Sequence, residues 1–377
     1  MKLLFISLME GSTWGGSEEL WYRAAQAALK QHTVTVCVFH WDHEPAPIGR
    51  LRKLGAAIVK VQRRAAYPLL KRVRTRFLGE GHVQGFNDLK AFDPDAICVS
   101  QGGTFDLGYH AAFYELITGM AKPFLIVSQH NLEHGGIVPA VFRNPIMDAL
   151  QKASHVFFVA ARNRAVAERQ LAAAIPNASI ISNPVNIASI GIRPFPPTNT
   201  SLKMACVARL DCGYKGQDLL MEALSSTEWR NRDFLLQLFG AGPDESYLKQ
   251  LIEFYGLGNK VYLAGKTADI DRVWEEHHVL VLPSLSEGTP LSMVEAMLCG
   301  RPVLAADVGG IDQYIETGKT GFLVATASVK ALRSALEDLW EQRNQLEQLG
   351  INAYHHALAI VDRNPEQTLL NKMTSLT

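Results

Sequence analysis

The stretch HHVLVLPSLSEGTPLSMVEAMLCGRPVLAA, His277 to Ala306, contains the alternation that decides the fold. Its first apolar run is typical of a buried strand, Thr289 is a suitable N-cap, and Pro290 is tolerated at the first helical position. Gly300 then ends the helix, and a second apolar run follows at once. The stretch therefore predicts a strand, a helix and a second parallel strand, which is the repeating unit of a three-layer α/β domain.

The same alternation continues in both directions. Short apolar runs in the first half are KLLFISL, TVTVCVF, DAICVS, FLIVSQH and HVFFVA, and those in the second half are MACVAR, FLLQLFG, KVYLAG, HVLVLP and PVLAA. Helix-period segments separate them, and a proline-rich stretch at residues 184–203 reads as a linker between the halves. We expect an α/β protein with two Rossmann-like doubly wound domains.

The expected domains follow from these patterns. Residues 1–185 form the first, residues 186–355 the second, and residues 356–377 a helical segment that packs back on the first domain. Ligands of open parallel sheets bind beyond the carboxyl ends of the strands. A cleft between two such sheets is therefore the expected binding site.

Composition narrows the function classes. The 377 residues contain 37 Lys plus Arg and 37 Asp plus Glu, so no net charge favours nucleic acid. The five cysteines form no CxxC pair, which argues against a zinc knuckle or a disulfide framework. The apolar start MKLLFISLMEGS is too short for a signal peptide, and no apolar run is long enough to span a membrane. A cytoplasmic protein is expected.

Two carboxylates stand out in the opening stretch. Glu287 lies in a Gly-Thr-Pro turn, and Glu295 lies inside a helix whose other residues are mostly apolar. A buried carboxylate is costly unless it is hydrogen-bonded. Vicinal hydroxyls, such as those of a ribose, would supply donors, and so would backbone amides or an arginine in a structural role. The amides at Leu291 and Ser292 begin the helix and favour an anion.

Cations and glycines occupy similar positions elsewhere. Arg209 directly follows a predicted strand and Lys215 precedes a helix, which suits a diphosphate, although such cations are often simply solvated. Gly15 and Gly16 lie in the first strand-to-helix turn, where bare backbone approaches a phosphate or sugar closely. Together these features predict a site for a phosphorylated ligand.

The pattern E-x7-E formed by Glu287 and Glu295 occurs with ARLDCGYKGQDLLMEAL, GAGPDESYLKQL, GIDQYIETGKTGFLV and the N-terminal GGSEEL. This set resembles the family 4 retaining glycosyltransferases of the GT-B fold. The likeness covers essentially the whole chain and is strongest in the second half. It implies two Rossmann-like domains facing a central cleft and a nucleoside-diphosphate sugar as co-substrate, with no cofactor and no metal.

The resemblance also implies residue roles on the donor side. Arg209 and Lys215 would neutralise the diphosphate, and Gly15, Gly16 and Gly242 would bind the donor with their backbone. The Arg209–Lys215 spacing is one residue longer than in many relatives, with DCGY filling the loop.

Further roles follow at the sugar. Glu295 would hold the ribose hydroxyls and Glu287 would contact the transferred sugar. His130, in VSQHN, would lie near the reaction centre, and Asn183, in ISNPVN, would lie beside the hinge. Backbone near the sugar and phosphate would come from Thr289, Pro290 and Leu291.

The function expected from this resemblance is transfer of a sugar, with retention and without a metal, from a nucleoside-diphosphate sugar to a saccharide or lipid-linked acceptor. Such an enzyme would serve polysaccharide or glycoconjugate biosynthesis. Two alternatives stay open at this point: a nucleotide-sugar epimerase or phosphorylase on the same fold, and a catalytically silent nucleotide-sugar-binding subunit.

Other motifs are weaker. HNLEH, His130 to His134, matches a zinc-peptidase pattern but follows a strand and runs into two glycines, so no metal site is expected. DPD, from Asp93, and DID, from Asp269, are interpreted as turns and caps. GAGPDE lacks the third glycine of a dinucleotide fingerprint.

A basic segment occurs between Glu44 and Glu80, where the chain has ten basic residues and no acidic one. Within it, YPLLKRVRTRFL separates an apolar face from a basic face at helical spacing. Residues 60–78 could therefore contact an anionic membrane at its inner face, pack as an ordinary amphipathic helix, or bind an anionic saccharide.

Overall fold

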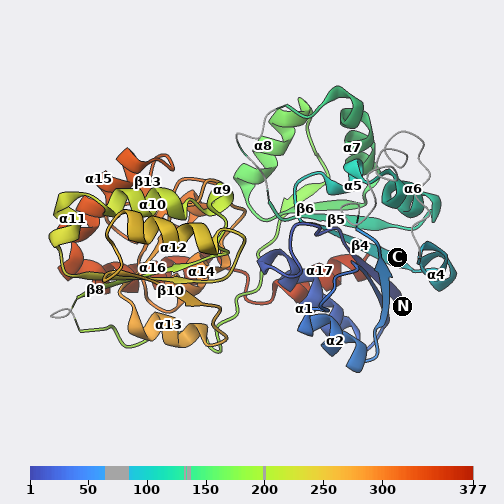
Figure 1. The fold of residues 1–377 in the computed structure, drawn as a ribbon. Coiled ribbons are helices and arrows are strands. Elements are labelled where there is room, and N and C mark those ends of the chain that lie inside the picture. The colour runs from blue at the N-terminus through green and yellow to red at the C-terminus, as the bar shows by residue number, and fades with distance from the viewer. Residues whose placement is uncertain (64–84, 131–132, 134–136, 198–200, 377) are drawn as a thin grey trace. The chain divides into compact units, whose positions relative to one another are not determined.

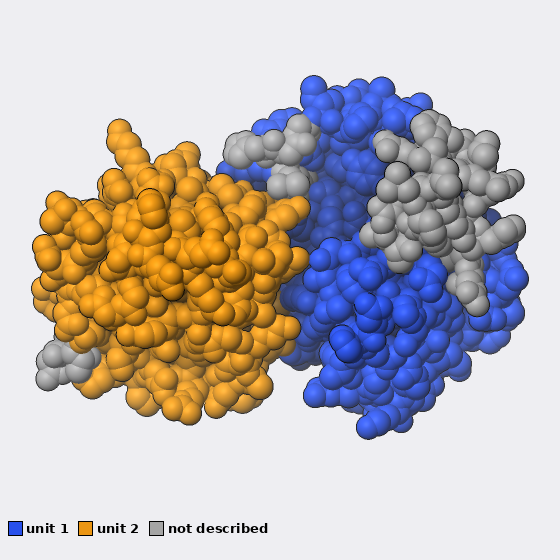
Figure 2. Space-filling view, viewed as in Figure 1, with its two compact units in different colours: residues 1–184, 362–377 blue, residues 185–361 orange. Residues whose placement is uncertain are grey.

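The computed structural model describes residues 1–63, 85–130, 133, 137–197 and 201–376. The chain forms two compact units (Figure 2). Unit 1 comprises Met1–Pro184 and Asp362–Thr377, and unit 2 comprises Val185–Val361.

Unit 1 is built on a seven-stranded parallel sheet of order β3-β2-β1-β4-β5-β6-β7 (Figure 1). Its strands are β1 Lys2–Ser7, β2 Thr33–Phe39, β3 Ala57–Val61, β4 Ala96–Gln101, β5 Phe124–Ser128, β6 His155–Phe158 and β7 Ala178–Ile180. Its helices are α1 Glu19–Ala28, α2 Ala46–Lys53, α4 Phe86–Phe92, α5 Asp106–Tyr109, α6 Ala111–Gly119, α7 Ala140–Lys152, α8 Ala161–Leu171 and α17 Pro365–Thr374.

Unit 2 repeats this architecture in a six-stranded parallel sheet of order β10-β9-β8-β11-β12-β13. Its strands are β8 Leu202–Val207, β9 Phe234–Phe239, β10 Val261–Gly265, β11 Val279–Leu282, β12 Val303–Ala306 and β13 Gly321–Val324. Its helices are α9 Cys212–Lys215, α10 Gln217–Leu224, α11 Thr227–Asn231, α12 Glu245–Phe254, α13 Ile270–Glu276, α14 Leu291–Leu298, α15 Val329–Glu341 and α16 Leu346–Ile360.

Each sheet is covered by helices on both faces, which explains why the central strands are continuously apolar. In β1, Leu3 and Phe5 join the cluster under α1 and α17, whereas Leu4 and Ile6 join the cluster on the opposite face. A strand buried on both faces has no polar side, so its sequence does not alternate. The predicted doubly wound α/β architecture is therefore confirmed in both units.

The sequence analysis missed three strands, and all three lie at sheet edges. They are β3, β7 and β13. The residues of β3 and β7 are largely half-buried or exposed, which weakens the hydrophobic pattern that identifies a strand. β13 is mostly buried but has only four residues, Gly321–Val324, and begins with a glycine.

The proline-rich stretch predicted as a linker is packed on unit 2. We call residues 185–195 the strap. Val185, Ile187 and Ile190 pack against the apolar cluster that includes α14, and Phe195 packs against the cluster on the other sheet face. The stretch joins the two units near residue 184, but it is held on unit 2 because apolar side chains between Pro184 and Pro194 are partly buried against that unit.

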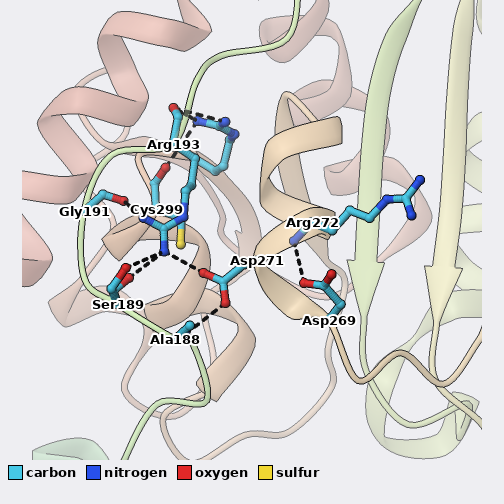
Figure 3. A network of polar contacts seen from close by, with 9 residues as sticks. Ala188, Ser189, Gly191, Arg193, Asp269, Asp271, Arg272 and Cys299 are labelled. Carbon is cyan, nitrogen blue, oxygen red and sulfur yellow. Dashed lines mark hydrogen bonds and ion pairs between the residues drawn. The ribbon is translucent and has the colours of Figure 1, made fainter.

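Polar contacts also hold the strap (Figure 3). The guanidinium of Arg193 lies 2.6 Å from Asp271 Oδ1, and the amide of Ala188 donates to Asp271 Oδ2 at 2.9 Å. Asp271 lies in the first turn of α13, one of the two aspartates of the DID motif. The other, Asp269, accepts from the amide of Arg272 and caps α13, as predicted.

Arg301 anchors the strap from beneath. Its side chain is fully buried, and its guanidinium donates to the carbonyls of Arg193 and Pro194 in the strap and of Trp274, Cys299 and Gly300 around it. Burial lowers the pKa of Arg301 to about 10, so the group is still charged at neutral pH. Five carbonyl oxygens therefore replace the water that a buried cation would otherwise require.

The C-terminal boundary also differs from the prediction. The division placed after residue 355 falls inside α16, which continues to Ile360. Beyond it, α17 packs on α1, and Leu369, Leu370 and Met373 join the unit 1 cluster that contains Leu3 and Trp21.

Residues 64–79 of the basic segment, which hold five of its ten basic residues and all of YPLLKRVRTRFL, lie outside the described residues. Within the described part, Lys60 and Arg52 each lie within 2.7 Å of Glu44, and Arg63 stacks on Trp41. No helix among the described residues is long and apolar enough to cross a membrane.

Candidate functional site

The predicted donor-side residues of unit 2 gather at the carboxyl edge of its sheet. Every strand pairing in this sheet is parallel, so all strands end at the same edge. Arg209 follows β8, Gly242 follows β9, and Glu287 follows β11. The edge is where ligands of doubly wound sheets bind.

Lys215 and Glu287 form an ion pair at this edge. The ammonium of Lys215 lies 2.7 Å from Glu287 Oε1, and the hydroxyl of Ser284 donates to the same oxygen at 2.7 Å. Glu287 is 6% exposed. Because the carboxylate is buried and the lysine only partly so, losing either charge would leave its partner poorly solvated.

Backbone hydrogen bonds hold the two loops together. The carbonyl of Tyr214 accepts from the amides of Leu285 at 2.9 Å and Ser286 at 3.3 Å. Lys215 and Glu287 are the next residues along each loop. Their pairing is therefore fixed by the main chain and does not depend on the side chains alone.

Two glycines at this edge are required by close backbone approach. A Cβ on Gly242 would lie 2.1 Å from the carbonyl oxygen of Leu210. A Cβ on Gly309 would lie 2.4 Å from the carbonyl oxygens of both Glu287 and Gly288, and its φ is +61°. The loop that presents Glu287 therefore rests directly on the turn after β12.

Helix α14 starts one residue later than predicted. Pro290 is the N-cap and Leu291 the first helical residue, and no side chain caps the helix, so the prediction of Thr289 as N-cap is wrong. Leu291 and Ser292 are half-buried, whereas residues 293–298 are buried. The first amides of a helix have no carbonyl one turn before them, so this end attracts an anion.

Glu295 is 4% exposed and contacts the strap. Its Oε1 accepts a hydrogen bond from the amide of Asn186 at 2.8 Å. The sequence left open whether Glu295 has a structural role. The structure shows one, because a backbone amide 109 positions away donates a hydrogen bond to this carboxylate oxygen. Glu295 joins the strap to α14.

Arg209 is the more exposed of the two predicted cations. Its side chain is 43% exposed, and its guanidinium lies 3.5 Å from a carboxylate oxygen of Asp211. Its carbonyl accepts from the side-chain Nε2 of Gln217, which holds the backbone just before the DCGY loop. Arg209 is therefore free to reorient, whereas Lys215 is held.

The cysteine nearest this site is chemically inert. Burial raises the pKa of Cys206 to about 12, and the nearby charge of Lys215 only partly opposes the effect. A thiol with this pKa stays protonated at neutral pH and is a poor nucleophile.

In unit 1, Gly15 and Gly16 begin a short 3₁₀ helix, Gly16–Glu18, between β1 and α1. His130 follows β5, and its carbonyl accepts from the Thr104 hydroxyl at 2.7 Å. Asn183 donates to Gln129 Oε1 at 2.8 Å, which ties the end of unit 1 to the residue before His130.

Sequence reasoning missed Glu18. It is 3% exposed, and burial raises its pKa from the ordinary 4.5 to about 7, although the Ser7 hydroxyl and the Trp21 indole lower it. Ser7 donates to Oε2 at 2.6 Å, while Oε1 has no hydrogen-bond partner among the described residues. The sequence feature that could have identified Glu18 is its position in the turn that follows Ser7, the serine at the end of β1.

The remaining motifs do not form a site in the described part of the chain. Asp95 accepts from the amide of Lys2 at 2.7 Å, consistent with a turn role. Three residues of HNLEH, Asn131, Leu132 and His134, lie outside the described residues. Of the other two, His130 follows β5, and Oε2 of Glu133 lies 2.9 Å from the guanidinium of Arg162. No group of three or more metal-ligating side chains occurs among the described residues.

Comparison with known proteins relates unit 2 to a family. Residues 192–356 match the family model of the glycosyl transferases group 1. The match spans most of the unit Val185–Val361. This confirms the resemblance at the level of the group, and the finer assignment to family 4 stays an expectation.

Curated relatives match over part of their length. D-rhamnosyltransferase WbpZ of Pseudomonas aeruginosa is 33% identical over 37% of this chain and 36% of its own. A GDP-mannose-dependent mannosyltransferase that acts on phosphatidylinositol monomannoside in Mycolicibacterium smegmatis is 27% identical over 62% of this chain and 65% of its own. The chain thus spans between about a third and just under two thirds of these two relatives.

Solved structures match over the full chain. Anabaena HepE in complex with UDP-glucose has a TM-score of 0.74 at 19% identity and 100% coverage of both chains. Sucrose-phosphate synthase from Thermosynechococcus elongatus has a TM-score of 0.75 at 17% identity, covering 100% of this chain and 98% of the other. At these identities the likeness establishes the GT-B fold.

Proposed function

We propose that the chain is a retaining, metal-independent glycosyltransferase that moves a sugar from a nucleoside-diphosphate sugar to a saccharide or lipid-linked acceptor. The observation that carries the proposal is the Lys215–Glu287 pair, which the main chain holds beside the start of α14 in the unit that matches the group 1 family model. A relative named for its dependence on GDP-mannose, and a structural neighbour solved with UDP-glucose, support the donor class.

The residues of unit 2 suit the charge that develops in such a reaction. When the bond between the anomeric carbon and the diphosphate breaks, negative charge grows on the leaving oxygen. In the proposal, Lys215 and Arg209 stabilise that charge together with the amides that begin α14. Lys215 exchanges part of its contact with Glu287 for the phosphate, and Glu287 then contacts the transferred sugar.

Glu295 fits the role of a ribose ligand that is already positioned. Its Oε1 is bound to the amide of Asn186, which fixes the carboxylate before a donor arrives. A preoriented carboxylate loses less conformational entropy when it accepts a hydroxyl donor. We therefore propose that Glu295 binds the ribose hydroxyls and joins the donor to the strap.

For the chemical step we propose a same-face route. The leaving phosphate oxygen takes the proton of the acceptor hydroxyl, whose oxygen attacks the same face of the anomeric carbon, so that configuration is retained. No protein nucleophile is needed, and His130 orients the transferred sugar. Arg209, Lys215 and the helix start supply the charge stabilisation without a metal.

The test begins with UDP-, GDP-, ADP- and dTDP-linked sugars. A donor that binds the folded chain raises its melting temperature. Incubation of that donor with saccharide acceptors, in the presence of EDTA, then separates transfer or slow hydrolysis from isomerisation and from binding without turnover. Only the first outcome supports the proposal; product anomers analysed by NMR decide retention.

Lys215→Ala provides the sharper form of the test. We expect turnover to fall about 10²-fold or more, as when one preorganised charge-stabilising group is removed. The matched control is Lys249→Ala, which removes an exposed lysine of α12 in the same unit and should leave turnover unchanged. Near-normal turnover in Lys215→Ala would contradict the assigned role.

A further inference from the structure

A small pocket lies at the carboxyl edge of the unit 1 sheet, over the ends of β1 and β2. Ser7, Trp14, Glu18, Val38, Phe39 and Trp41 are among the residues that line it. About 20 Å³ within it is open to the centre of a water molecule. Holding one water takes about 10–15 Å³ by this measure, so the interior accommodates one oxygen atom and little more.

One carboxyl oxygen of Glu18, a polar residue that lines this pocket, accepts no hydrogen bond among the described residues. The indole N–H of Trp21, which lies close enough to lower the pKa of Glu18, likewise has no acceptor there. Glu18 is 97% removed from solvent, since it is 3% exposed, and Ser7 satisfies only its Oε2. Oε1 has no hydrogen-bond partner among the described residues. A buried carboxyl oxygen without a donor is costly, so a group that brings a hydroxyl hydrogen into the pocket would relieve that cost.

The aromatic side chains beside Glu18 are held in place. The Trp14 indole donates to Glu19 at 2.8 Å and meets the Tyr22 ring edge-on at 5.5 Å. The Arg63 guanidinium lies 3.7 Å from the centre of the Trp41 ring. Rigid aromatic surface suits the apolar face of a sugar ring, whereas the nearby guanidinium disfavours a cationic ligand.

We propose that this pocket is an acceptor subsite that receives one hydroxyl group of a neutral hexoside. The hydroxyl donates to Glu18 Oε1, and the sugar ring lies against the tryptophans at the pocket. The inference rests on the proposed function, because it takes the hexoside to be the saccharide acceptor or its terminal residue.

The experiment uses the full chain and the methyl α-glycosides of glucose, galactose and mannose, with binding followed by ligand-observed NMR. For the glycoside that binds best, a set of monodeoxy analogues removes one hydroxyl at a time. We expect one analogue to bind about tenfold more weakly than its parent, which is the size of a lost hydrogen bond to a carboxyl group. The other analogues should differ by less than about threefold.

Two variants test the pocket by different means. Glu18→Gln changes the acceptor, and Val38→Ile adds one methyl group to the space meant for the hydroxyl while keeping every polar group. Both should weaken binding of the parent glycoside about tenfold and should reduce the difference between it and the critical deoxy analogue. Glu115→Gln, on the exposed surface of α6 in the same unit, is the matched control and should bind normally.

The opposing outcomes are specific. Wild-type affinity in both pocket variants, an even response across the deoxy series, or no binding of any of the three glycosides overturns the subsite. Saturable binding of tetramethylammonium in place of the glycosides also overturns it, in favour of a cation site. Circular dichroism shows whether Glu18→Gln is folded, and Val38→Ile decides the matter if it is not.

The donor experiments separate this inference from the proposed function. If the chain binds a glycoside through Glu18 but neither binds nor hydrolyses any nucleoside-diphosphate sugar, the proposed function fails and the hydroxyl subsite is retained. If donors are bound and hydrolysed normally while the pocket variants behave as wild type, the subsite fails and the proposed function is retained.

Discussion

The two units treat buried charge differently. Among the described residues, the buried ionised or ionisable Arg and Glu side chains are Glu287, Glu295 and Arg301 in unit 2 and Glu18 in unit 1. The three in unit 2 each have partners from the protein, whereas Glu18 keeps one oxygen without a donor. Unit 2 therefore pairs its buried charged groups internally, and unit 1 leaves one carboxyl oxygen of Glu18 without a hydrogen bond among the described residues.

The turns at the carboxyl edges of the two sheets also differ in how closely their main chain is packed. In unit 2, Gly309 is needed because the carbonyls of the Glu287 loop press against it. In unit 1, a Cβ on Gly15 would meet only the hydroxyls of Ser12 and Ser17, at 3.8 Å. One edge is formed by closely packed main chain and the other by side chains around a space.

The largest expected effect comes from Arg301, the most completely partnered of the four charges. Arg301→Leu should lower the free energy of unfolding by about 3–5 kcal/mol, because five backbone carbonyls around a buried site each lose the hydrogen bond that the guanidinium donates. Urea unfolding measures this loss of stability. Hydrogen exchange should show that the amides of the strap and α13 exchange faster than in the wild type. Arg272→Leu, which removes an exposed ion pair within α13, should leave stability nearly unchanged.

Replacing Glu18 should have the opposite effect to replacing Arg301, because it should raise the free energy of unfolding at neutral pH. A carboxyl with a pKa of 4.5 unfolded and about 7 folded binds more protons in the native state between those values, so native stability falls as pH rises through that window. Across this window the free energy of unfolding should change by about 3 kcal/mol, because the folded and unfolded pKa values differ by about 2.5 and each pKa unit corresponds to about 1.36 kcal/mol. Glu18→Gln should abolish this slope.

The measurement is the unfolding free energy of both proteins from pH 4.5 to 7.5. The stability of Glu18→Gln relative to wild type should increase steadily across this range and level off above pH 7. A constant difference would mean that Glu18 titrates normally, and the contrast between the units would then lose its main support.

Gly309→Ala and Gly15→Ala form a matched pair across the two edges. The first should cost at least about 2 kcal/mol, because a left-handed backbone and a backbone clash act together. The second should cost less than about 1 kcal/mol, since its Cβ has room. Thermal unfolding measures both, and equal costs would remove the distinction between a packed edge and an open one.

The smallest effect is expected for Glu295→Gln. The amide oxygen of glutamine still accepts from Asn186, so stability should change by about 1 kcal/mol or less. Binding of the best nucleoside-diphosphate sugar should nevertheless weaken about tenfold, because a neutral amide is a poorer acceptor for two hydroxyls. Unchanged donor affinity, measured by calorimetry, would leave Glu295 with a structural role alone.

Sequence reasoning succeeded where burial or main-chain packing restricts residue choice. Central strands such as β1 and β11 are buried on both faces, so they read as apolar runs, and the edge strands β3 and β7 do not. The turns of unit 2 require glycine beside fixed polar residues, which gives a recognisable motif. The side chains around the unit 1 pocket face no comparable backbone restriction.

The failures have physical causes as well. The hydrogen-bond donor to Glu295 is a backbone amide, and nearly every residue type has one, so the sequence cannot identify this partner. Prolines suggested a linker, but Val185, Ile187 and Ile190 of the strap are partly buried against the apolar cluster of unit 2. Glu18 looked like an ordinary acid in the first turn of a helix, where negative charge is favourable, and only the fold shows that Ser7 and an enclosed space lie beside it.

The position of α17 in unit 1 has a consequence for biosynthesis. Unit 2 is one continuous segment, whereas unit 1 needs Leu369, Leu370 and Met373 to cover Leu3 and Trp21. During translation, the apolar face that contains Leu3 and Trp21 stays uncovered until more than 175 residues beyond the first segment have been added. The unit made first is thus finished last, and chaperones have a defined surface to protect in the meantime.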